Sequence, residues 1–310
     1  SFLSNRCFYT FIFLMNVLTS YAQVVEFERK GVGGGGYMFA PSIDPRNPDH
    51  VYLNCDMAGV YETNDGGYHW TLLPYQQLVS TTKAVVQFTN DPKILYTVKR
   101  SLSNLQSPLQ RGVPAQSIDG GLTWNEINDP TETGIHRLFA DPNNYNRLLV
   151  SEYNRLFLSI DQGKHWKEIW KPLDEICWIG GVFWDQDQIF VGTGKGLLVS
   201  HDGGLQFSLE HFVGANTNDG IFQMVGRKIN NQIQFYLITA TSNSLYPWED
   251  IIELRHHITG IFTLDYNTKK WIDFSNYIPS SIKIQWVDMA INQKDTIYLA
   301  GHENDLPVIL

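Results

Sequence analysis

The sequence predicts an all-β fold of the β-propeller type, built from four-stranded sheets. Two observations predict it: one octapeptide returns along the chain, and short β-branched or aromatic runs alternate with turn residues. A helical period is visible only at 249–254. With 310 residues, of which 43% are hydrophobic, the chain can bury a substantial core.

The octapeptide has Ser or Thr first, Asp third, Gly fifth and Trp or Phe last. Its Asp residues, together with that of a fifth, degenerate copy at 263–271, are 54, 42, 41 and 63 residues apart, about the length of a four-stranded blade. The four clear copies occupy 63–70, 117–124, 159–166 and 200–207, and their acidic residues are Asp65, Asp119, Asp161 and Asp202.

The composition of the octapeptide is typical of a tight turn. Hydroxyl and carboxylate side chains can bind backbone N–H groups, Gly permits positive φ, and the aromatic residue can fill the space between neighbouring sheets. The motif resembles the Asp box, or bacterial neuraminidase repeat. We therefore assign a structural role to its Asp residues.

Each octapeptide lies within a longer repeating unit of strands and Asp-Pro-type turns. A sixth unit begins at Trp286 and reaches Gly301, and its third strand and octapeptide are expected beyond Leu310. We expect about five and a half blades, so that 23–310 forms a partial propeller truncated at its C-terminus.

Repeat topology places the loop between the second and third strands opposite the octapeptide, around the central channel. Asp56 and Glu152 occupy matching positions there, nine residues before an octapeptide Asp. A pair of carboxylates can serve glycoside hydrolysis, although Glu152 could equally be a solvated rim residue. Starts of inner strands supply possible substrate contacts, which could instead belong to blade cores: Tyr37, His136, Trp178 and Trp286.

Residues 31–70 carry a more specific pattern. A Gly-rich segment leads through Tyr-Met-Phe-Ala-Pro-Ser-Ile-Asp-Pro to Val-Tyr-Leu-Asn-Cys-Asp56-Met-Ala-Gly. This resembles the opening of glycoside hydrolase family 74, the xyloglucanases and related β-glucanases. Cys55 and Ala58 depart from the family pattern, which has Thr and Gly at these positions.

The resemblance implies two seven-bladed propellers with a cleft between them, and inversion of configuration through two Asp residues. Asp56 then corresponds to the general base, while the general acid belongs to a second propeller outside this chain. The expected ligand is a polysaccharide or oligosaccharide of β-glucan or xyloglucan type.

Two other functions remain open. A sialidase needs an Arg triad and an Arg-Ile-Pro segment, but Arg is sparse and no such segment occurs. A non-catalytic binding scaffold, of the sortilin-like or photosystem-assembly type, needs neither catalytic carboxylate.

The N-terminal segment has the features of a secretory signal peptide spanning 1–22. Arg6 precedes an apolar stretch that ends in Ser-Tyr-Ala before Gln23. We therefore expect a secreted protein, extracellular or periplasmic, without a membrane anchor after cleavage. Export permits a disulfide between Cys55 and Cys177, but two cysteines do not require one.

The remaining patterns argue against other partners and cofactors. The net charge is −9 and no Lys/Arg run occurs, which disfavours nucleic acid and anionic membranes. The glycines of 31–36 precede no helix, so a dinucleotide site is not expected. His256 and His257 lack a second ligand pair with zinc spacing. We predict no cofactor and no metal.

Overall fold

The computed structural model describes residues 31–32, 38–55, 59–78, 85–101, 112–172, 178–211, 219–241, 258–289, 296–304 and 306–310. The chain divides into two compact units, Ser1–Gly31 and Val32–Leu310, and all described strands lie in the second. The predicted signal peptide and the predicted helical stretch at 249–254 fall outside the described residues.

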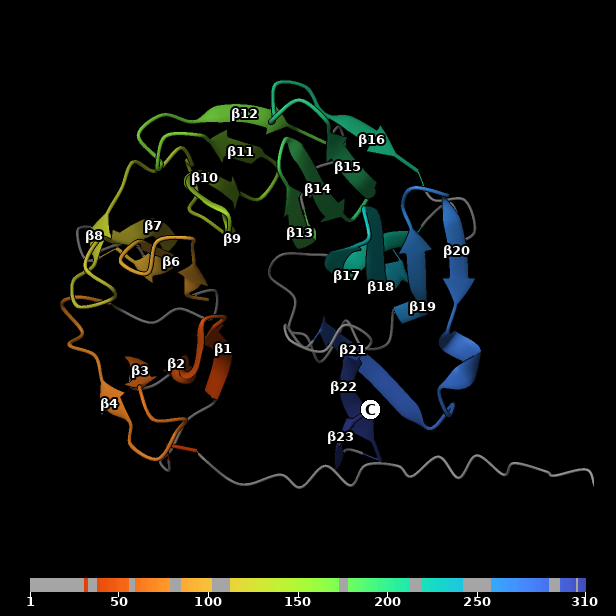
Figure 1. Ribbon diagram of the computed structural model, residues 1–310, viewed down its shortest axis with the longest axis horizontal. Coiled ribbons are helices and arrows are strands. Elements are labelled where there is room, and N and C mark those ends of the chain that lie inside the picture. Colours follow the sequence, from red (N-terminus) through yellow and green to blue (C-terminus); the bar gives the residue numbers. More distant parts are fainter. Residues whose placement is uncertain are drawn as a thin grey trace, which may run out of the picture. The chain divides into compact units, whose positions relative to one another are not determined.

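The second unit consists of antiparallel sheets in a propeller arrangement, so the predicted all-β class is confirmed (Figure 1). Five sheets have four strands, each hydrogen-bonded to the next strand in the sequence. Sheet 1 contains β1 (Met38–Asp44), β2 (Asn47–Cys55), β3 (Gly59–Thr63) and β4 (Thr71–Leu72). Sheet 2 contains β5 (Gln87–Phe88), β6 (Leu95–Arg100), β7 (Gly112–Ser117) and β8 (Asn125–Glu126).

The next three sheets repeat this order. Sheet 3 contains β9 (Arg137–Asp141), β10 (Asn144–Ser151), β11 (Leu156–Ser159) and β12 (Lys167–Trp170). Sheet 4 contains β13 (Ile179–Asp185), β14 (Gln188–Thr193), β15 (Gly196–Ser200) and β16 (Ser208–Glu210). Sheet 5 contains β17 (Asp219–Ile229), β18 (Gln232–Thr241), β19 (Ile258–Asp265) and β20 (Lys270–Asp273).

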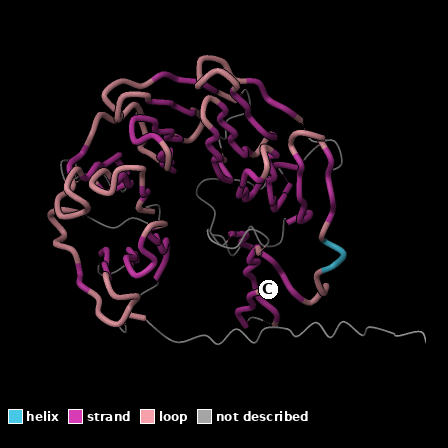
Figure 2. Tube along the Cα trace, in the orientation of Figure 1, coloured by secondary structure: helices cyan, strands magenta, loops and turns pink. Residues whose placement is uncertain are grey.

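Sheet 6 differs from its expected form in two ways. It contains three strands, β21 (Ile282–Met289), β22 (Ile297–Glu303) and β23 (Leu306–Ile309), so the third strand is present rather than beyond the chain. Its first strand begins at Ile282, four residues before Trp286, and the short 3₁₀ helix η2 (Ser275–Tyr277) and a turn precede it (Figure 2).

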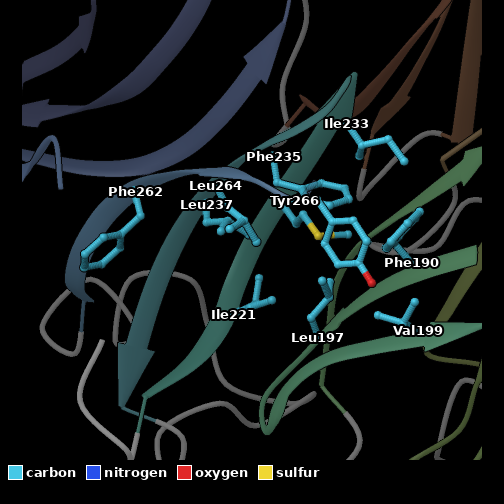
Figure 3. Close-up of a cluster of buried hydrophobic side chains, with 11 residues drawn as sticks. Phe190, Leu197, Val199, Ile221, Ile233, Phe235, Leu237, Phe262, Leu264 and Tyr266 are labelled. Carbon is cyan, nitrogen blue, oxygen red and sulfur yellow. The ribbon is translucent and has the colours of Figure 1, made fainter. Parts of the chain in front are cut away.

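Apolar side chains fill the spaces between successive sheets. Between sheets 4 and 5, Phe190 and Phe235 are fully buried, with ring centroids 5.2 Å apart, and Tyr266 packs edge-on against Phe190 at 4.7 Å (Figure 3). The β-branched and aromatic residues that predicted strands therefore also supply the core.

The octapeptide turns share one set of hydrogen bonds. In the second copy, the hydroxyl of Ser117 donates to Oδ1 of Asp119 and accepts from the nitrogen of Gly121, both at 2.8 Å. Oδ1 of Asp119 also accepts from the nitrogen of Thr123 at 2.8 Å. The same three bonds, at 2.8–3.0 Å, recur in the turns at 63–70, 159–166 and 200–207.

The degenerate fifth copy forms a different turn. Asp265 ends β19, and its Oδ1 accepts from the nitrogen of Thr268, three residues on, at 3.1 Å. The octapeptide turns instead bond the fourth residue after Asp. Because no Gly follows Asp265, Lys269 takes the left-handed conformation at φ 56° and closes a shorter hairpin.

The second glycine of an octapeptide turn touches the preceding sheet. A Cβ at Gly121 would meet the phenol oxygen of Tyr52 in sheet 1, and one at Gly204 would meet Leu158 in sheet 3. Trp124, which ends the second octapeptide, is 3% exposed and packs edge-on to Tyr52. These turns consequently set the contact between neighbouring sheets as well as closing a hairpin.

Candidate functional site at the loops between second and third strands

Antiparallel order fixes which loops share an end of each sheet. The octapeptide turns connect third to fourth strands, so the connections between second and third strands lie at the opposite end. We call this opposite end the loop end. It carries the connections at 56–58, 101–111, 152–155, 194–195 and 242–257.

Asp56 directly follows β2 and lies outside the described residues. Its flanking residues are described: Cys55 is buried and pairs with Gly59 across the two strands that the connection joins. Cys177 lies outside the described part of the chain, so the disulfide expectation is not tested.

Glu152 is not the solvated rim residue that the sequence also allowed. Its side chain is 2% exposed. Oε1 accepts from the nitrogen of Glu132 at 2.8 Å and from the nitrogen and hydroxyl of Thr133 at 2.6 and 2.8 Å. Oε2 accepts from Nε of Arg155 at 2.8 Å. The carboxylate therefore fastens the segment leading into sheet 3 to the loop after β10.

The electrostatics of Glu152 agree with this structural task. Burial alone would raise the pKa of the carboxyl, but the hydrogen bonds from Thr133, Glu132 and Arg155 outweigh burial and lower it. A carboxylate that stays ionised with both oxygens occupied suits a loop anchor better than a proton carrier.

Thr193 occupies in sheet 4 the repeat position that Glu152 occupies in sheet 3, and it also forms hydrogen bonds within its own loop. Thr193 is fully buried, donates its hydroxyl to the oxygen of Gly196 at 2.8 Å and accepts from the nitrogen of Lys195 at 3.1 Å. The repeat position thus holds a turn-forming side chain in both described cases.

Trp178 does not offer a face to a sugar ring. It is 7% exposed, its Nε1 donates to the oxygen of Phe222 at 2.9 Å, and its ring stacks on Phe222 with centroids 5.5 Å apart. The guanidinium carbon of Arg137 lies 5.2 Å from the centroid of the Trp178 ring. The indole is thus held within an aromatic and cationic stack, as the blade-core alternative anticipated.

The other predicted ligand contacts have unequal environments. His136 is 4% exposed, and its nitrogen donates to the oxygen of Ser151 at 2.8 Å. Trp286 is 39% exposed and lies in the middle of β21, on the face opposite the buried Val287. Tyr37 lies outside the described residues. The structure therefore buries His136 and Trp178 and leaves Trp286 open.

Sequence reasoning missed Arg137, which begins β9 at the loop end. Successive strand residues face opposite sides, so Arg137 shares a side with Phe139, which packs toward sheet 4. That alternation was readable from the sequence. The packing of Arg137 against Trp178, 41 residues away, could not be read from the sequence.

The octapeptide carboxylates lie at the end of each sheet opposite the loop end, and they accept hydrogen bonds from residues of their own turns. Backbone and side-chain hydrogen bonds from His69 lower the pKa of Asp65 to about 2. The nitrogen of His165 does the same for Asp161, whose pKa is also about 2. Each of these carboxylates accepts hydrogen bonds within its own turn.

The described part of the chain contains no group of three or more His, Cys, Asp or Glu side chains placed to hold a metal ion. His256 and His257 lie outside it. No helix within the described residues is long and apolar enough to cross a membrane.

Comparison with known proteins finds the fold in solved structures. No protein-family profile matches the chain, and no curated protein matches it. The GH74 xyloglucanase from Xanthomonas campestris matches with a TM-score of 0.64 at 17% identity, covering 91% of this chain and 46% of that protein. The GH74 enzyme of Niastella koreensis matches with a TM-score of 0.62 at 17% identity, covering 87% and 42%.

A protein of another kind shares the fold. YCF48 bound to D1 peptide matches with a TM-score of 0.55 at 15% identity, covering 88% of this chain and 81% of that one. At these identities the likeness concerns the fold alone. The chain spans less than half the length of the two GH74 proteins.

Proposed function

We propose that the chain is one propeller of a secreted carbohydrate-active hydrolase similar to family 74, acting on β-glucan or xyloglucan with inversion. Asp56 is the general base in this proposal, and the general acid lies in a second propeller outside the chain. The octapeptide turns are Asp boxes, and the ring has seven blades.

The observation that carries the proposal is the position of the 56–58 connection. The pairing of Cys55 with Gly59 puts this connection at the loop end of sheet 1, away from the octapeptide turn. The family resemblance of residues 31–70 assigns the base to this connection, and two GH74 enzymes share the fold. The withdrawal of Glu152 into its loop leaves Asp56 as the candidate.

A binding scaffold is the second candidate. The described candidates Glu152, His136 and Trp178 are buried within the protein's own contacts. YCF48, solved with a bound peptide, matches over 81% of its length. Such a protein would bind a ligand at the loop end without turnover.

The deciding experiment uses the complete open reading frame that contains this chain. We expect release of reducing ends from xyloglucan or mixed-linkage β-glucan. Asp56→Asn keeps the side-chain volume, so folding and glycan binding should persist while turnover falls by about 10²–10⁴-fold, equivalent to roughly 3–5 kcal/mol of barrier.

Asp49→Asn is the matched control, because Asp49 is an exposed carboxylate of β2 at the opposite end of the strand. Equal turnover in wild type and Asp56→Asn would contradict the base assignment. Binding of glycan or peptide without hydrolysis of any glycan would favour the scaffold.

Secretion is tested separately. If residues 1–22 are a signal peptide, N-terminal sequencing of the exported protein should begin at Gln23. Retention of the N-terminal segment would contradict it.

A further inference from the structure

Arg137 is an exposed cation fixed at the loop end. It is the first residue of β9 and pairs in register with Ser151, immediately before the Glu152 loop. Its guanidinium lies over the ring of Trp178, which the bond to the oxygen of Phe222 holds in place. The stack of Arg137, Trp178 and Phe222 thus joins three consecutive sheets.

Stacking leaves the edge of the guanidinium available. A planar guanidinium that packs by its face still directs its N–H donors outward in its own plane. Among the described residues, no oxygen accepts a hydrogen bond from Arg137 and no carboxylate forms an ion pair with it. Arg147 and Arg155, by contrast, form ion pairs with Asp141 and Glu152.

Arg137 is exposed to solvent at the start of β9, with the Trp178 ring against one face of its guanidinium. The residue is exposed, yet desolvation by the surrounding protein lowers its pKa. A partly desolvated cation without an anionic partner is unfavourable, and a bound anion offsets this cost.

We propose that Arg137 is a carboxylate-binding position of the loop end, and that its ligand is a uronic acid residue of a glycan. The inference rests on the proposed carbohydrate function and extends it from neutral glucans to acidic ones. The planar fork of Arg137 can donate hydrogen bonds to both carboxylate oxygens, with Trp178 keeping the fork in one orientation.

Additional contacts, rather than net charge, favour a carboxylate on an oligosaccharide over a free anion. At a net charge of −9 the protein repels anions of any size at long range, so a carboxylate needs direct contacts in order to bind. A carboxylate carried on an oligosaccharide gains further contacts along the loop end, which a free acetate lacks. One fixed cation then selects acidic residues within a glycan.

The test compares two ligands that differ only at C6: cellotetraose and the tetramer of β-1,4-linked glucuronic acid. Calorimetric titration of the chain should give roughly 10- to 100-fold tighter binding of the acidic tetramer, the range of a charge-assisted hydrogen-bonded pair. Arg137→Gln should abolish this preference and leave cellotetraose binding unchanged. Arg137→Lys should retain only part of it, because an ammonium neither stacks nor forks.

Lys93→Gln is the matched control, since it removes one exposed cation from the β5–β6 turn at the opposite end of sheet 2. It should bind both tetramers as the wild type does. Thermal unfolding of each variant checks that the fold persists.

The possible outcomes distinguish failure of the carboxylate-binding proposal from failure of the proposed carbohydrate function. Equal affinity of the wild type for both tetramers, or an unchanged preference in Arg137→Gln, overturns the carboxylate position while glycan binding stands. Arg137-dependent binding of an oligoglutamate peptide without binding of either tetramer overturns the inference and the carbohydrate function together.

Discussion

Thr123 holds Asp119 with both its backbone and its side chain: the nitrogen donates to Oδ1 at 2.8 Å and the hydroxyl to Oδ2 at 2.6 Å. Asp119→Asn replaces one carboxylate oxygen by an NH₂ group, which cannot accept a hydrogen bond. We therefore expect the melting temperature to fall by about 2–4 °C, the effect of losing one hydrogen bond in a protein of this size.

Differential scanning calorimetry measures this change, and Glu126→Gln is the control because Glu126 is an exposed residue of β8 in the same sheet. In the complete protein, hydrolysis should be the same in Asp119→Asn as in the wild type. A selective loss of turnover in Asp119→Asn would contradict the structural role of the octapeptide Asp.

Acid should weaken the octapeptide turns in a defined pH window. The pKa of Asp161 is about 2 in the folded protein, below the value of about 3.9 expected in an unfolded chain. A lowered folded pKa adds stability that is present above the unfolded value and is lost as pH falls through the folded value. The contribution should thus be complete above about pH 4 and vanish near about pH 2.

The measurement is the melting-temperature difference between wild type and Asp161→Asn across this window. Other carboxylates titrate in both proteins and cancel in the difference. A difference that stays constant down to pH 2 would contradict the proposed linkage.

The octapeptide turns were predictable because all their contacts are local. Ser117, Asp119 and Thr123 lie within seven residues of one another, so their spacing alone specifies the hydrogen bonds. The second glycine is also fixed by its turn, at φ 97° in Gly121. Fold class followed from four such turns at blade-like spacing.

The loop end was harder to predict because its contacts join distant segments. Glu152 is bound by Thr133, 19 residues earlier, and nothing in the sequence between them marks that pairing. The stack of Trp178 on Phe222 spans 44 residues and two sheets. Repeat register therefore gave the positions of these side chains along the strands but not their burial.

Sheet 6 shows a limit of strand patterns. Its third strand, Leu306–Ile309, has four residues and includes Pro307. Proline within a short run argues against a strand in the sequence. In the structure, Pro307 pairs with His302 next to the start of β23, where little of the ladder is lost.

Glu152→Gln should destabilise the fold more than its loop position suggests. The amide retains one acceptor oxygen but presents its NH₂ group to Arg155 in a site that is almost sealed from water. We expect the free energy of unfolding to fall by about 1–3 kcal/mol, as for an unsatisfied buried polar group.

Urea unfolding measures this loss. Glu132→Gln is the control, because the side chain of Glu132 is 78% exposed and its contact to Arg155 is 3.2 Å long. Its effect should stay within about 0.5 kcal/mol. Equal effects of the two substitutions would show that the Glu152 carboxylate does not anchor the loop.

The two glycines of one octapeptide should respond differently to alanine. Gly120 and Gly121 both have positive φ, at 77° and 97°, so a Cβ strains the backbone at either position. At Gly120 the added Cβ meets only the oxygen of Pro92 at 3.7 Å, an ordinary contact, whereas at Gly121 it collides with the phenol of Tyr52. The third octapeptide already carries Gln162 at the first position, with φ 67°.

Gly120→Ala should therefore cost about 1–2 kcal/mol of unfolding free energy, the strain of a left-handed residue. Gly121→Ala should cost about 2–5 kcal/mol, because overpacking between sheets 1 and 2 adds to that strain.

A second variant, Tyr52→Phe, removes the phenol oxygen, which is buried and has no hydrogen-bond partner among the described residues. Combined with Gly121→Ala it should recover part of the loss. Urea unfolding of the wild type and the four variants tests the contact, and equal losses at Gly120 and Gly121, with no recovery in the double variant, would mean that the second glycine serves its own turn alone.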